Sequence, residues 1–152
     1  MGRGGAGPAY GVFNLGEMDS YRDEFLPWKE GDGFVGELAA PFPHEKPWND
    51  LSGRPSSELG ETDEDEYFRL QEQFQRRYFQ ATNGAIPICH LGCALRQWLV
   101  VSGNETGHVW NDNTAEYEGF APERDGNLKR ISFFRWYRRW LDDALAILNR
   151  ST

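Results

Sequence analysis

Cys89, His90 and Cys93 lie close together in the sequence, and thiolate and imidazole groups are the usual ligands of zinc. A structural zinc site normally has four ligands in two paired groups. This chain has only two cysteines, and its other histidines, His44 and His108, have no matching spacing. We therefore expect no metal and no other cofactor, and we interpret both cysteines as small apolar residues that stay reduced.

The residue types used by hydrolytic enzymes are present without a recognisable arrangement. None of the three histidines belongs to a Gly-x-Ser-x-Gly elbow or a His-Glu-x-x-His helix. The acidic run 63–66 lacks the glycine and the terminal glutamate of a calcium-binding loop. Carboxylates are plentiful, but the sequence singles out no pair in which one would act as general acid and the other as general base. We expect no catalytic residues and a protein that is not an enzyme.

Length and composition limit the class of protein. With 152 residues, 39% hydrophobic and 26% charged, the chain is typical of one globular domain, here residues 1–152. It contains no apolar run approaching the roughly 20 residues that span a bilayer. It also lacks an apolar segment near its start that could serve as a signal peptide. We expect a cytoplasmic protein without membrane contact.

The net charge of −8 is unevenly distributed. Between Glu17 and Glu72 there are 16 acidic and 5 basic residues, a balance of −11, and the remainder has 8 acidic and 11 basic, a balance of +3. An acidic surface repels phosphate backbones, so we expect no nucleic-acid binding. It favours encounter with a basic protein, or it is a solvated surface that maintains solubility.

The elements that must position these residues centre on residues 86–122. Three apolar runs of strand length, at 86–89, 95–101 and 108–110, predict an antiparallel meander. The middle run is apolar on both faces and therefore predicts the central strand. Gly103 and Gly107 bound the second turn, where positive φ or close backbone approach is required. Residues 117–122 add a short edge strand.

Two amphipathic helices flank the meander. The first is predicted at 63–80 with Thr62 as N-cap and an apolar stripe that includes Leu70 and Phe74. The second, at 133–149, follows Ser132 and has one apolar half, so we expect it to pack on the sheet. Nearer the start we expect a strand at 10–15 and a short helix at 17–28. The proline-rich stretch at about 27–62 predicts a long irregular insertion.

The meander also contains a family motif: Gly92-Cys93, then Trp98 to Gly103, then Gly107 to Trp110, and finally Asp112. Its spacing resembles the core of the SUKH superfamily. This superfamily includes the Smi/Knr-type fungal cell-wall regulators and bacterial immunity proteins that neutralise polymorphic toxins. The resemblance extends over most of residues 4–148 and is vague between 28 and 62. The motif residues with a mainly structural role are Gly92, Trp98, Gly103, Gly107, Trp110 and Asp112.

The resemblance implies an α+β fold in which an antiparallel-rich mixed sheet has helices packed on one side, with an amphipathic helix at the C-terminus. In proteins of this type a helix normally precedes a stretch like Gly4–Gly11, so we expect that N-terminal helix to be missing from this chain. The implied function is a bacterial immunity protein that binds a cognate toxin, often a nuclease or deaminase. A regulatory scaffold like the fungal proteins is the alternative, and a small-ligand or metal-dependent enzyme is a third hypothesis. The oligomeric state stays open.

A toxin that binds nucleic acid must be basic near its active site. We therefore expect the acidic segment to face the toxin, with Glu61, Asp63, Glu64 and Asp65 as candidate contacts. Trp110 and Asp112 have two interpretations. They anchor a partner at a strand end, or Trp110 fills the core while Asp112 caps a turn.

Overall fold

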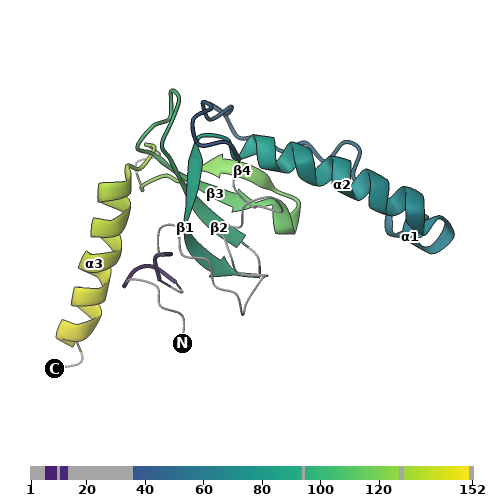
Figure 1. Cartoon of the computed structure of the whole chain (residues 1–152). Coiled ribbons are helices and arrows are strands. Elements are labelled where there is room, and N and C mark those ends of the chain that lie inside the picture. Colours follow the sequence, from purple (N-terminus) through teal and green to yellow (C-terminus); the bar gives the residue numbers. More distant parts are fainter. Residues whose placement is uncertain (1–5, 10, 14–35, 94, 127–128, 151–152) are drawn as a thin grey trace.

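The computed structural model describes residues 6–9, 11–13, 36–93, 95–126 and 129–150 (Figure 1). Its strands are β1 (Ala85–Gly92), β2 (Leu95–Val100), β3 (Val109–Asn113) and β4 (Gly119–Pro122). Its α-helices are α1 (Ser57–Thr62), α2 (Glu64–Ala81) and α3 (Phe133–Arg150), and a short 3-10 helix, η2 (Thr114–Glu116), joins β3 to β4. The expected α+β class is confirmed.

The four strands form one antiparallel sheet in the order β1-β2-β3-β4, as the meander predicted. The expectation of a mixed sheet is not met among the described residues, because every pairing between these strands is antiparallel. In the β2–β3 register Trp98 lies opposite Trp110, and Leu99 lies opposite Val109. Because side chains alternate along a strand, these two pairs point to opposite faces. Both faces are covered, and β2 is a central strand.

Helices α2 and α3 contact opposite faces of the sheet, each through one end, which corrects the expectation that the helices pack on one side (Figure 1). On the face that holds Trp98, the core includes Ala81 and Tyr78 from the last turns of α2. On the face that holds Val109, the core includes Trp136 from α3. The physical reason lies in β2, whose two faces are both apolar and require a cover on each side.

Helix α3 packs on the sheet only through its beginning. Trp136 is its one buried residue among the described residues, and Phe133 and Tyr137 pack beside it. The rest of the apolar stripe was expected on the sheet, but Leu145 and Leu148 are 49% and 64% exposed. The helix runs away from the sheet along its length (Figure 1), so its later turns are beyond reach of the core. None of the helices in the described ranges combines the length and apolarity needed to cross a membrane.

Loop segments close the edges of the sheet. Trp48 exchanges two backbone hydrogen bonds with Phe120 of β4, at 2.8 and 2.7 Å. At the other edge Val12 bridges to Cys89 of β1. Val12 belongs to the expected strand at 10–15, of which only residues 11–13 lie in the described ranges; the expected helix at 17–28 lies outside them.

The segment expected to be irregular at 27–62 is described from residue 36 onward and contains a helix, α1. Ser56 caps α1, accepting a hydrogen bond from the Leu59 amide at 3.2 Å. Asp63 then caps α2, in place of the expected Thr62, which is the last residue of α1. The prolines of this segment predicted irregular structure. The Ser-Ser-Glu sequence that caps the helix follows directly after Pro55, so the proline content concealed it.

Candidate functional site

Asp112 is fully buried on β3 and accepts hydrogen bonds from three residues. The Tyr78 hydroxyl and the Trp98 indole N–H, the latter at 3.2 Å, donate to its Oδ2 atom. The Thr114 amide and hydroxyl donate to its Oδ1 atom at 3.1 and 2.6 Å. Burial, followed by the Asp112 charge, holds the pKa of Tyr78 well above its usual range. Asp112 therefore joins α2, β2 and η2 through a satisfied buried carboxylate.

The other motif residues also serve the fold. Trp98 and Trp110 are fully buried, which supports the interpretation that Trp110 fills the core. Gly92, Gly103 and Gly107 all have positive φ, at 104°, 102° and 88°. A Cβ atom at Gly103 would come within 3.0 Å of the Phe42 amide nitrogen, so this turn also needs close backbone approach. None of these six residues presents a side chain suited to partner binding.

The candidate partner-binding residues lie together at the end of a projecting structure. We call residues 57–72 the acidic arm: α1 and the first half of α2, which extend away from the sheet (Figure 1). Glu61, Asp63, Glu64 and Asp65 are all exposed. The arm has seven acidic residues and one arginine, a balance of −6. One of the four candidates also has a structural role, because Asp63 Oδ1 accepts a hydrogen bond from the Glu66 amide at 3.1 Å as the α2 cap.

A second feature is a cleft beside α2, next to the loop that follows Trp48. We call it the arginine cleft. Its volume is about 240 Å³. Its lining comprises Trp48, Asn49, Asp50, Leu51, Arg54, Gln71, Phe74, Arg77, Tyr78, Arg96, Thr114 and Ala115. Three of these side chains are arginines and one is an aspartate. The cleft is therefore basic in a protein whose net charge is −8.

Sequence reasoning missed the arginine cleft. Its arginines come from the loop, from α2 and from β2, so no local spacing connects them. Arg77 by itself is a basic residue near the C-terminal end of a helix, where a positive charge favours the helix dipole, and its position indicates no site. The one available signal was Arg96, a charged residue that lies between Leu95 and Gln97 near the start of the predicted central strand and is only 7% exposed in the structure. Arginine is seldom buried unless it is paired.

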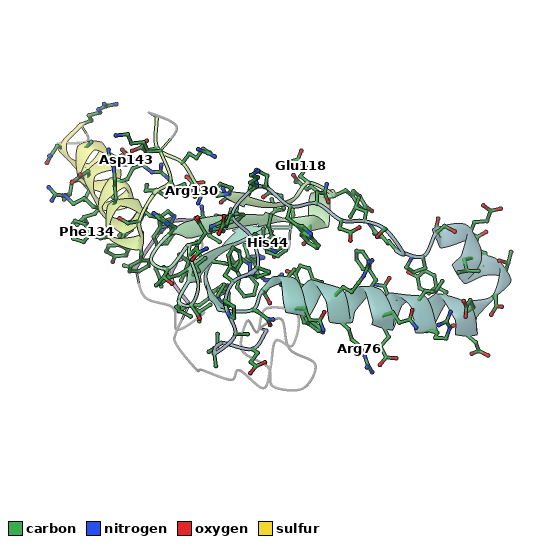
Figure 2. All side chains as sticks on the ribbon, turned by 90° about the horizontal axis from the view of Figure 1, so that it is seen from above. His44, Arg76, Glu118, Arg130, Phe134 and Asp143 are labelled. Atoms are coloured by element: carbon green, nitrogen blue, oxygen red, sulfur yellow. The ribbon has the colours of Figure 1, made fainter. Side chains whose placement is uncertain are left out.

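His44 occupies an aromatic cage that the sequence also did not reveal. Its ring stacks on Phe120 with centroids 5.7 Å apart and lies 5.0 Å from the rings of Phe42 and Trp48. Its Nε2 atom is 3.0 Å from the Ala81 carbonyl oxygen, which accepts only from a protonated nitrogen. Burial lowers the pKa of His44, and the bond to Ala81 opposes that effect in part. His44 is central in the molecule, between α2 and the sheet (Figure 2).

The cysteine and histidine group at 89–93 is divided between two environments. Cys89 is fully buried, and burial raises its pKa to about 11. Cys93, in the β1–β2 turn, is exposed. His90 points to the face opposite Cys89, because it lies across from Arg96 while Cys89 lies across from Gln97. Within the described ranges no three histidine, cysteine or acidic side chains are grouped as metal ligands.

Comparisons with family models, with curated proteins and with solved structures each returned no match to this chain. The arrangement of its own residues and the motif around β2 and β3 are therefore the basis for assigning a function.

Proposed function

We propose that this chain is a non-enzymatic protein-binding domain, and that it acts in the bacterial cytoplasm as an immunity protein that binds and neutralises a cognate basic toxin. The acidic arm carries this proposal. Seven carboxylates within 16 residues, balanced by one arginine, create a strongly negative surface at the far end of α2. Such a surface increases the rate of encounter with a positively charged protein and orients it.

The arm also has an aromatic contact point. Phe68 is 59% exposed and packs edge to face on Tyr67, with ring centroids 5.6 Å apart. Interfaces commonly combine a few aromatic anchors with a charged rim. Phe68 with Glu64 and Asp65 one turn earlier is such a combination. A surface kept acidic only for solubility gains nothing from an exposed phenylalanine.

The motif around β2 and β3 supports the choice of toxin neutralisation among protein-binding functions. Its resemblance is to a superfamily that includes toxin-immunity proteins, whose targets are often nucleases or deaminases. A toxin of that kind must attract phosphate backbones and is basic around its active site. Binding of the acidic arm over that basic surface would block access of nucleic acid. The chain itself, being acidic, would not compete for nucleic acid.

A pull-down with the tagged chain from the source cell, followed by mass spectrometry, tests the proposal. We expect one basic protein that is recovered at low salt and lost at high salt. The informative variant is Glu64→Lys with Asp65→Lys, and its matched control is Asp142→Lys with Asp143→Lys on α3. Both change the net charge by the same amount, but only the first alters the arm.

We expect the arm variant to lose the basic partner and the α3 control to retain it. Circular dichroism must show that the arm variant keeps its helix content, because lysine in the first turn of α2 opposes the helix dipole. Retention of the partner by a folded arm variant would refute the assignment of the arm. Recovery of wall-synthesis enzymes or kinases instead of a basic toxin would favour the regulatory scaffold.

A further inference from the structure

The arginine cleft adjoins the acidic arm, with which it shares Gln71, and has the opposite charge. Arg54, Arg77 and Arg96 line it, and Asp50 is the one acidic lining residue among those that the structure describes. The balance of these four charges is +2, although the whole chain carries −8. The other ionisable group in the lining is the Tyr78 hydroxyl, which donates to the buried Asp112. An anion is the charged species that this cleft favours.

The arginines are held in place before any ligand binds. Arg77 donates to the Ser52 hydroxyl at 3.2 Å, and its Nη1 atom is 3.5 Å from Asp50 Oδ2. Arg54 lies over the Tyr117 ring, 4.1 Å from its centroid, and donates to the Tyr117 hydroxyl at 3.1 Å. A guanidinium has five N–H donors, so such anchoring leaves donors for a ligand oxygen. Groups fixed in advance lose less entropy on binding.

Apart from the charged residues and the polar side chains of Asn49, Gln71 and Thr114, the lining of the cleft is aromatic or aliphatic. Trp48, Phe74 and Tyr78 contribute aromatic rings, and Leu51 and Ala115 contribute aliphatic surface. Aromatic walls favour a planar ligand that can stack or lie edge to face. The volume of about 240 Å³ is smaller than the roughly 300–1,000 Å³ of pockets for drug-sized ligands. It fits a ligand with one ring.

We propose that the arginine cleft binds a small planar anion, namely one aromatic ring that carries a carboxylate or a phosphate group. The guanidinium groups of Arg54 and Arg77 hold the anionic oxygens, since planar guanidinium matches both groups in a two-pronged geometry. The ring lies among Trp48, Phe74 and Tyr78. This ligand site is independent of the proposed partner on the acidic arm, and neither requires the other.

Titration calorimetry of the full chain with benzoate and with phenyl phosphate tests the site. Benzyl alcohol supplies a neutral ring, and acetate and inorganic phosphate supply the charge without a ring. We expect saturable binding of benzoate or phenyl phosphate, and binding at least tenfold weaker for the neutral ring and for the two ringless anions. The stronger of the two aromatic anions identifies the head group. Absence of binding by both, or equal binding of benzyl alcohol, would overturn the proposal.

Two neighbouring arginines provide a matched pair of variants. Arg77 lines the cleft, whereas Arg76 points into solvent on α2 (Figure 2) and pairs with Glu72 at 2.6 Å. We expect Arg77→Gln to weaken binding of the aromatic anion at least tenfold and Arg76→Gln to leave it unchanged. Arg54→Gln, at an exposed loop position, gives a second test that does not depend on α2. If both Arg77→Gln and Arg54→Gln bind as the unaltered chain does, the site is wrong.

Discussion

Tyr78 on α2 donates a hydrogen bond to the Asp112 carboxylate on β3, across 34 residues of sequence. Asp112 is fully buried and Tyr78 packs half-buried against the core on the α2 face of the sheet, so the bond joins the helix to that core. It fixes the position at which α2 leaves the sheet. The same helix carries Arg77 into the arginine cleft and supports the acidic arm, so both proposed sites depend on this contact.

Replacement of Asp112 should strongly destabilise the fold. Asp112→Ala leaves the Tyr78 hydroxyl and the Trp98 indole N–H buried without their acceptor, and we expect a loss of about 3–5 kcal/mol in the free energy of unfolding. Tyr78→Phe removes one donor to a charged acceptor and should cost about 1.5–3 kcal/mol. Urea denaturation measures both. The control is Tyr67→Phe, on the same helix, and a cost for Tyr78→Phe no greater than for this control would contradict the role of the bond.

The stability of the protein should fall as the pH decreases below the ordinary pKa of histidine, about 6.5. Burial in its aromatic cage lowers the pKa of His44, so the unfolded state binds a proton at a higher pH than the folded state. The contribution of neutral His44 to the unfolding free energy is therefore fully present above about pH 6.5. It is lost as the pH falls towards the lowered pKa of the folded state. Burial and then Arg96 lower the pKa of His90 in the same direction.

His44→Gln keeps an N–H donor for the Ala81 carbonyl but cannot titrate. We expect its unfolding free energy, measured in urea between pH 5 and 8, to depend less on pH than that of the unaltered chain. His90→Gln should remove a further part of the slope. An unchanged slope in the His44→Gln variant would show that His44 takes up its proton equally well in both states.

Replacing Gly84 or Gly107 distinguishes two costs of adding a side chain: the strain of a positive φ and a steric clash with neighbouring atoms. Both have positive φ, 64° and 88°. A Cβ atom at Gly84 would lie 2.5 Å from the Ala40 carbonyl oxygen, whereas at Gly107 it would meet nothing within 4 Å. We expect Gly107→Ala to cost about 1–2 kcal/mol from backbone conformation alone and Gly84→Ala to cost clearly more. Equal melting temperatures for the two variants would contradict the close approach at Gly84.

The two cysteines should differ sharply in reactivity. The thiolate is the reactive form, and Cys89 is buried with a pKa raised to about 11, whereas Cys93 is exposed. We expect a thiol reagent such as iodoacetamide at pH 8 to modify one cysteine in the folded protein and both in urea. Cys93→Ser should remove the fast reaction. Mass spectrometry of the labelled peptides identifies the site, and rapid labelling of Cys89 in the folded chain would contradict its burial.

Local periodicity and composition determined the meander, the two long helices and the glycine turns. Apolar residues on both faces of the run at 95–101 indicated a strand covered on both sides, and the acid-rich start of α2 with its apolar stripe indicated a helix. These features depend on near neighbours in the chain, and the burial of Trp98, Trp110 and Asp112 agrees with them. The acidic balance of residues 17–72 was likewise readable without a structure.

Only the tertiary structure decided how these elements combine. The apolar half of α3 predicted full packing on the sheet, but the direction of the helix lets only its first turns reach the core. The arginine cleft and the cage of His44 bring together residues from segments far apart in sequence, such as Arg54, Arg77 and Arg96. Sequence patterns reveal the properties of residues that are near one another in the chain. A site forms where the fold brings residues from distant segments together.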